Sequence, residues 1–295
     1  MSWSMILQIL LNNLFMVGVL SLTTLGIALT YKSATVANFA QQTVATVGAF
    51  VAAYLFMRQG INPWLAALGG IGACFVIGWL IDALIVGKMT ALRSGRIMIV
   101  IGLVLVISAL TPLIFGMIPY QFPRFFTGNL TWEKFGASFT LTRNGLFTFI
   151  ISAVVVAIVF IALNVTKWGL NVRATSADKT VAAMMGINTD RVTAMSWAIS
   201  SACAALGAVL HSAQTTNVTT EMMVPVQTTA LLAFVMGGFT SFYGPVIGAV
   251  IIPLAAALLA LISGLWANVF LQVLVLLVIL IKPMGLFGKK VAVKV

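Results

Sequence analysis

The chain has 295 residues, of which 61% are hydrophobic and only 7% are charged. A soluble domain has about a quarter of its residues charged, so this composition excludes an ordinary soluble protein. The apolar runs are continuous, whereas an outer-membrane barrel alternates polar and apolar residues, so the sequence predicts membrane-spanning helices.

The net charge is +11, from 16 Lys and Arg against 5 Asp and Glu. In a soluble protein this excess suggests nucleic acid, but in a membrane protein basic residues collect in cytoplasmic loops and fix the orientation. We therefore expect membrane lipid and no nucleic acid as a partner. Cys74 and Cys203 fall inside apolar runs, so neither a disulfide nor a metal site is expected.

The predicted spans follow from the thickness of a bilayer, because a core of roughly 30 Å takes about 20 apolar residues per helix. In chain order they are Ile9–Thr30, Thr35–Met57, Ile61–Val86, Ile97–Ile118, Gly145–Val165, Val192–Ser212, Val226–Phe239, Tyr243–Ile262 and Leu265–Ile281. The seventh is short and ends in a Gly-rich run. The predicted fold is an all-α polytopic membrane protein, a bundle of about eight or nine transmembrane helices with broken or re-entrant segments, in one domain over 1–295.

Basic residues predict the orientation. Those placed in the cytoplasm are Lys88, Arg93 and Arg96 in one loop, Lys167, Arg173, Lys179 and Arg191 in loop 167–191, and Lys282, Lys289, Lys290 and Lys294 at the C-terminus. Loop 119–144 and the N-terminus then lie outside. The aromatic residues of loop 119–144 suit an interfacial belt or a docking surface for an external protein, and Phe135–Leu141 could form a short strand.

Ionisable residues are rare within the predicted spans. Asp82 is the only carboxylate there, near a cytoplasmic end, where a snorkelling or capped interfacial residue is expected. His211 is expected to be packed and hydrogen-bonded. The sequence contains no catalytic constellation and no G-x-x-x-x-G-K-[ST] motif, so the chain is not expected to be an enzyme or to hydrolyse ATP through a P-loop.

Neutral polar residues form two stripes. Asn38, Gln42 and Thr46 recur every four residues in the second span, which predicts one helix face, with Gln41 beside them. The second stripe, in the sixth span, consists of Ser196, Ser200, Gly207 and His211. Both stripes fit either close helix packing or the lining of a path for a polar solute.

Loop 167–191 contains a helix-compatible run, Arg173–Met185, which Gly186 is placed to terminate. Val181, Met184 and Met185 give this run an apolar side, while Asp178 and Lys179 stay solvated, and Asn188 could cap the next span. A helix this short is marginal alone. It could dock into a groove on a soluble protein or lie on the lipid surface.

Four passages resemble one known family, the membrane subunits of bacterial ABC importers for branched-chain amino acids. They are Asn38-Phe39-Ala40 with Gly48-Ala49, Arg173-Ala174 with Ala182-Ala183 and Gly186-Ile187, the run Gly237–Ala249, and Lys282–Gly288. The chain departs from the family pattern at Gln41 and Gln42, where His-Gly is usual, at Thr240 and at Lys282.

The resemblance implies a permease subunit of the bacterial cytoplasmic (inner) membrane, without a cofactor of its own. Its implied partners are two cytoplasmic ABC ATPase subunits that bind ATP-Mg, a second permease subunit, which in this family is often non-identical, and a periplasmic or lipid-anchored solute-binding protein; the sequence leaves open whether the chain pairs with itself or with a different permease. Residues expected to couple to the ATPases are Arg173, Ala174, Asp178, Val181, Met184, Gly186 and Ile187. Residues expected along the translocation path are Asn38, Gln41, Gln42, Thr46, Ser200, Gly237 and Gly238.

Other functions stay open from sequence. An ion-coupled secondary transporter needs a midplane carboxylate or cation site, for which Asp82 is a poor candidate. A lipid-modifying enzyme needs a catalytic constellation. A non-transporting assembly subunit is a third possibility. Branched-chain amino acids are the family's usual solutes, while other amino acids, amides, urea and small acids use related permeases.

Overall fold

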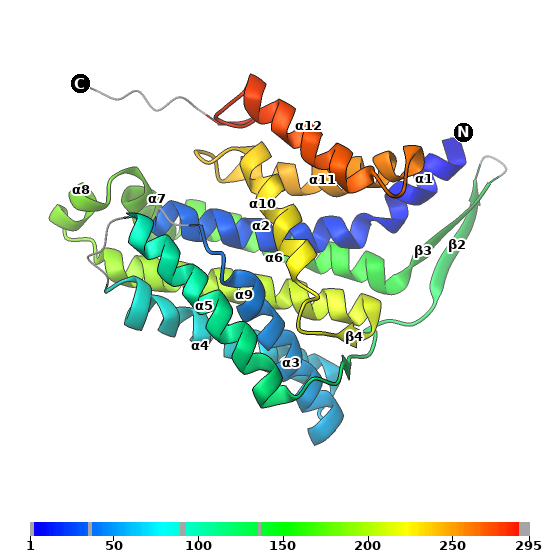
Figure 1. The fold of residues 1–295 in the computed structure, drawn as a ribbon, viewed down its shortest axis with the longest axis horizontal. Coiled ribbons are helices and arrows are strands. Elements are labelled where there is room, and N and C mark those ends of the chain that lie inside the picture. The colour runs from blue at the N-terminus through cyan, green and yellow to red at the C-terminus, as the bar shows by residue number, and fades with distance from the viewer. Residues whose placement is uncertain (1–2, 35–36, 89–92, 135–136, 289–295) are drawn as a thin grey trace.

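The computed structural model describes residues 3–34, 37–88, 93–134 and 137–288, and over these the chain is a bundle of helices with two small strand pairs (Figure 1). The elements are α1 (Trp3–Asn12), α2 (Leu14–Ala34), α3 (Gln41–Gln59), α4 (Pro63–Ile81), the π-helical turn η1 (Asp82–Val86), α5 (Arg93–Phe115), β1 (Tyr120–Gln121), β2 (Asn129–Lys134), β3 (Ala137–Thr142), α6 (Arg143–Val165), α7 (Lys167–Ala177), α8 (Lys179–Met184), α9 (Thr189–Thr215), β4 (Asn217–Val218), α10 (Val224–Gly237), α11 (Tyr243–Ile262) and α12 (Ala267–Ile281).

Six helical segments of the described chain are long and apolar enough to cross a membrane: Leu14–Ala34, Pro63–Val86, Gly95–Phe115, Arg143–Val165, Thr189–Thr215 and Tyr243–Ile262. Shorter apolar helices are α1, α10 and α12. This confirms the predicted class, an all-α multi-pass membrane protein.

The two ends of the bundle carry different elements. Figure 1 shows α7 and α8 at one end, and the N-terminus with the β2–β3 hairpin at the other. β2 pairs with β3 antiparallel, and β1 pairs with β4. The strand expected over Phe135–Leu141 is present as β3, although Phe135 lies outside the described residues, as do Lys289, Lys290 and Lys294.

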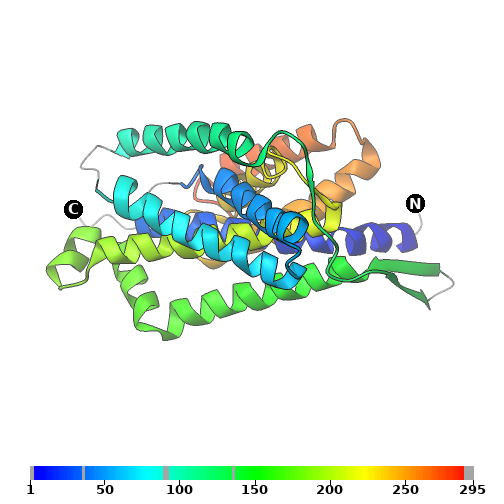
Figure 2. The same ribbon diagram turned by 90° about the horizontal axis from the view of Figure 1, so that it is seen from below.

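Helices α2 and α9 form the buried centre, and small residues allow their close approach. A Cβ added at Gly26 of α2 would lie 2.9 Å from Ser200 Oγ of α9 and 2.7 Å from Gln41 Nε2 of α3. Helices in lipid associate through such close packing because burial from water gives no driving force there. By contrast, α5 is mostly exposed and lies at the edge of the bundle (Figure 2).

Two predicted helix boundaries are wrong. The second span was expected from Thr35, but α3 begins at Gln41, so Asn38 precedes the helix and does not share a face with Gln42 and Thr46. The first span was expected as one helix over Ile9–Thr30, but the chain divides at Asn13 between α1 and α2. Periodicity identifies a helix more reliably than it fixes the first residue.

The predicted short seventh span is α10, which has 14 residues. At a rise of about 1.5 Å per residue it covers about 21 Å, less than the hydrocarbon core. It ends at Gly237 and is followed by Gly238, whose φ of +107° favours glycine. The segment after α12 covers this break, because Leu286 N donates to Met236 O at 2.8 Å and Phe287 N to Gly237 O at 3.2 Å.

Candidate functional site

A polar cavity of about 360 Å³ lies between α3, α5 and the loop that precedes α10. Its lining residues are Gln42, Thr43, Thr46, Ser108, Thr111, Pro112, Thr220, Glu221 and Val224. Polar side chains in a membrane protein are costly unless they face protein or water. Because α5 is mostly exposed in the single chain, this polar face requires a further protein surface or water beside it.

Hydrogen bonds within the helices determine what the cavity offers. The hydroxyl of Thr43 donates to Ala40 O at 2.8 Å, and that of Thr46 donates to Gln42 O at 2.8 Å. The hydroxyl of Thr111 donates to Ile107 O at 2.7 Å. Each hydroxyl has a single proton, so these three threonines have only lone pairs left for a solute.

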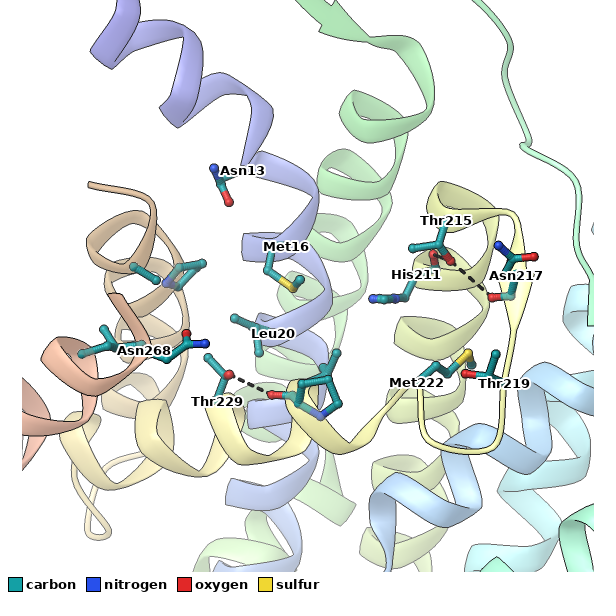
Figure 3. Close-up of a pocket in the computed structure, with 15 residues that line it drawn as sticks. Asn13, Met16, Leu20, His211, Thr215, Asn217, Thr219, Met222, Thr229 and Asn268 are labelled. Atoms are coloured by element: carbon teal, nitrogen blue, oxygen red, sulfur yellow. Dashed lines mark hydrogen bonds between the residues drawn. The ribbon is translucent and has the colours of Figure 1, made fainter. Parts of the chain in front are cut away.

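A second cavity, of about 390 Å³, lies between α2, α9, α10, α11 and α12 (Figure 3). His211 extends into it from α9, while Asn13 and Asn268 line it from the opposite side. His211 Nδ1 has no hydrogen-bond partner among the described residues, so the expected hydrogen-bonded packing of this histidine is not found at that atom.

The loop before α10 contributes to both cavities. Thr219 and Met222 line the second cavity, whereas Thr220 and Glu221 line the polar one. The backbone of residues 219–222 therefore separates the polar cavity from the second cavity.

The predicted path residues fall into separate environments. Gln42 and Thr46 line the polar cavity. Gln41 and Ser200 are fully buried: Gln41 Nε2 donates to Thr23 O at 2.9 Å, and Ser200 Oγ donates to Gln41 Oε1 at 3.0 Å. These contacts hold α2, α3 and α9 together, which favours the packing interpretation for these two residues.

The remaining path candidates do not line either cavity. Asn38 is buried before α3, and its carbonyl oxygen accepts a hydrogen bond from Gln227 Nε2 at 3.2 Å. A Cβ added at Gly237 would overlap Gly244 O, and one added at Gly238 would lie 2.7 Å from Met284 O. The glycines therefore allow backbone segments to pack, and their assignment to the path stays a prediction.

The segment 167–191 folds as two helices. The predicted continuous helix Arg173–Met185 is wrong, because α7 ends at Ala177 and Asp178 caps α8, accepting hydrogen bonds from Thr180 N at 2.8 Å and Val181 N at 3.0 Å. A capping carboxylate competes with helix continuation and satisfies amide groups that a new helix leaves free.

The end of α8 matches the sequence prediction. Gly186 has a φ of +84°, and Gly186 N donates to Ala183 O at 3.0 Å, which terminates the helix. Asn188 caps α9, its Oδ1 accepting from Arg191 N at 3.0 Å. Both residues therefore have the capping roles that their positions suggested.

The α8 apolar patch consists of Val181, Met184 and Met185, whose exposed fractions are 53%, 80% and 78%. It lies on the segment that Figure 1 shows at one end of the bundle, while the predicted coupling residues Ala174 and Ile187 precede and follow α8 in the sequence. Arg173 Nη1 donates to Asn164 Oδ1 at 3.2 Å, and Lys179 pairs with Asp190 across 3.5 Å, which ties α7 to α6 and α8 to α9.

Asp82 is more buried than the sequence suggested. It is 1% exposed, in the turn η1 beside α9, and its carboxylate oxygens have no hydrogen-bond partner among the residues described. The expectation of a snorkelling carboxylate is wrong. It lines a third cavity, of about 360 Å³, with Lys88, Asp190 and Arg191 at the α7–α8 end of the bundle.

Sequence reasoning missed five polar residues of this cavity: Thr43, Ser108, Thr111, Thr220 and Glu221. Ser108 and Thr111 are three residues apart in an otherwise apolar span, which puts them on one helix face. Glu221 is the one charged residue of its loop. The spacing of Ser108 and Thr111 and the isolated charge of Glu221 can both be read from the sequence. The sequence does not show that α3, α5 and the loop before α10 pack together to form one cavity.

A multi-pass bundle of apolar helices with a polar cavity between α3, α5 and the loop before α10 is compatible with a membrane transport protein. A family profile described as "Branched-chain amino acid transport system / permease component" matches residues 9–280, so the chain belongs to that family.

Curated relatives agree with the family. The high-affinity branched-chain amino acid transport system permease protein LivH of Salmonella typhimurium is 29% identical, over 98% of this chain and 97% of its own length. A probable branched-chain amino acid permease of Methanocaldococcus jannaschii is 27% identical, over 92% and 89%. BraD of Pseudomonas aeruginosa is 24% identical, over 98% of both chains.

Proposed function

We propose that this chain is the permease subunit of an ABC importer that moves a branched-chain amino acid across the bacterial cytoplasmic membrane. The observation that carries the proposal is the α8 apolar patch at the end of a family-defined permease. Exposed methionine and valine side chains on a capped helix suit a groove on a soluble protein. The sequence itself contains no P-loop, so ATP-Mg is bound by partner subunits.

The α7–α8 end faces the cytoplasm in this proposal. Lys88, Arg173, Lys179 and Arg191 lie in the two segments that join helices at this end, as the positive-inside rule requires. The N-terminus and the β2–β3 hairpin then face outward, where a periplasmic or lipid-anchored solute-binding protein would dock. Two ATPase subunits serve the importer, of which one contacts α8 of this chain.

The second permease subunit covers the open face of α5 in this proposal. That face carries the polar cavity, so a path for solute runs between the two subunits and past Gln42 and Thr46. A homologous but non-identical partner would supply the opposite wall. The exposed polar groups of α5 would then face water in the path, and no longer lipid.

Transport follows from a change in access to this path. ATP binding draws the ATPases together and moves α8 as a rigid body, and α7 transmits the movement because it packs against α2, α6 and α9. Solute binding needs no redox or covalent chemistry from this chain, because a polar cavity lined by hydrogen-bonding groups and one carboxylate can hold a zwitterion.

Reconstitution with the neighbouring ATPases, second permease and binding protein tests the proposal. We expect uptake of radiolabelled leucine into proteoliposomes to require ATP and to persist when ion gradients are dissipated. Uphill leucine uptake by this chain alone on a proton or sodium gradient would refute the ABC importer proposal and indicate an ion-coupled carrier. The buried carboxylate of Asp82 would then be the candidate site for the coupling ion.

A further inference from the structure

We propose that Glu221, with the hydroxyl oxygens around it, forms the recognition site for the ammonium group of the transported solute. The inference rests on the proposed function and specifies its chemistry: the path selects a solute that carries a protonated amine.

Charge is the first argument. Glu221 is the only ionisable side chain among the described residues that line the polar cavity. The chain has only five Asp and Glu in all. Of the other four, Asp82 lies in a different cavity, Asp178 caps α8, Asp190 pairs with Lys179, and Glu133 lies on the β2–β3 hairpin. Glu221 alone brings a negative charge to this space.

The balance of donors and acceptors is the second argument. The hydroxyl protons of Thr43, Thr46 and Thr111 are engaged by backbone carbonyl groups, so these side chains offer lone pairs. An ammonium group has three donors and no acceptor, and therefore complements such a surface. The amide of Gln42 supplies donors for the carboxylate of an amino acid.

The position of Glu221 is the third argument. Its loop is held at both ends, because β4 pairs with β1 and Val224 N donates to Glu221 O at 3.0 Å at the start of α10. The carboxylate therefore belongs to a short turn attached to two fixed elements. The cavity of about 360 Å³ falls in the usual range for small-molecule sites, roughly 300 to 1,000 Å³.

Uptake by substituted importers tests the role of the carboxylate. Glu221→Gln keeps the shape and removes the charge, and we expect the initial rate of ATP-driven leucine uptake to fall about tenfold, since hydrogen bonds to charged groups are the strong ones. Glu221→Asp should remain within about threefold of wild type. Glu221→Asp is the matched control, because it alters the same side chain and keeps the negative charge. Rates are normalised to the amount of chain in the membrane.

A labelling experiment measures the charge of the cavity without transport. A cysteine introduced by Ser108→Cys, at an exposed position that lines the cavity, should react faster with a cationic than with an anionic thiosulfonate reagent, and Glu221→Gln should reduce that ratio at least threefold. The native Cys74 and Cys203 are buried, and the chain without Ser108→Cys gives the background.

The outcomes separate the two proposals. Wild-type uptake by Glu221→Gln, or a labelling ratio that does not change, overturns the ammonium site while the importer stands. If the wild-type complex fails to take up leucine with ATP, the proposed function itself fails.

Discussion

Gln41 and Gln42 are adjacent in the sequence but lie in different environments, so the same substitution at each has different expected effects. Gln41 is fully buried and bonded to Thr23 of α2 and Ser200 of α9, whereas Gln42 lines the polar cavity. Replacing Gln41 by Leu should destabilise the protein, and replacing Gln42 by Leu should reduce transport.

The magnitude follows from the two hydrogen bonds of Gln41, at 2.9 and 3.0 Å. A side-chain hydrogen bond between membrane helices contributes about 0.6 kcal/mol on average and up to about 1.7 kcal/mol. Loss of both bonds therefore costs about 1–3 kcal/mol. The branched leucine also meets Gly26, where the helices approach closely, and this adds to the cost.

The assay is thermal unfolding of the purified chain in detergent, with leucine uptake by the reconstituted importer measured in parallel. Gln41→Leu should lower the unfolding midpoint by several degrees, while Gln42→Leu should leave it within about one degree and slow uptake. An unchanged midpoint for Gln41→Leu would refute the packing role. Equal destabilisation by both substitutions would show that the two environments do not differ as described.

Three further predictions follow from other parts of the chain. Met184→Asp, in the α8 apolar patch, should abolish leucine-stimulated ATPase activity of the complex while the chain still inserts; intact coupling would exclude α8 as the contact. Gly237→Leu should reduce the folded yield, because its Cβ would overlap Gly244 O, whereas Gly72→Leu, with open space around it, should not; equal yields would contradict that packing. A cysteine at Trp132 should react with an impermeant reagent outside the cell and one at Asp178 should not; the reverse would invert the topology.

Much of the fold could be predicted because lipid imposes simple rules. Continuous apolar runs identified the six segments that are long and apolar enough to cross a membrane, whereas the expected spans Thr35–Met57 and Leu265–Ile281 are helices that do not reach that length and hydropathy together. The Gly-rich run after Met236 identified a short, broken helix. The helix boundaries that were predicted wrongly depend on competition between helix continuation and side-chain capping. Asp178 divides the expected helix because its carboxylate caps α8, and sequence periodicity alone does not show whether such a residue stays solvated or interrupts the helix.

The candidate site could be predicted only in part, because it is assembled from distant segments. Gln42 and Thr46 were identified by their spacing on one helix. Thr111 and Glu221 join them only when α5 and the loop before α10 pack beside α3, and no local pattern reports that arrangement. Asn38 illustrates the opposite error, since it keeps the four-residue spacing and yet precedes the first residue of α3.

The proposed coupling needs an element that joins the α8 apolar patch to the polar cavity, and α9 has the required continuity. It is a single helix of 27 residues, about 40 Å long at 1.5 Å per residue. Its first turn is tied to α8 through Lys179 and Asp190, and its last residues lead through β4 into the loop that carries Glu221. Because α9 is mostly buried against α2, α3 and α4, it would move with them as one body, while α5 has few partners within the chain. A displacement of α8 would therefore shift the loop of Glu221 relative to α5, which changes the width of the cavity between them.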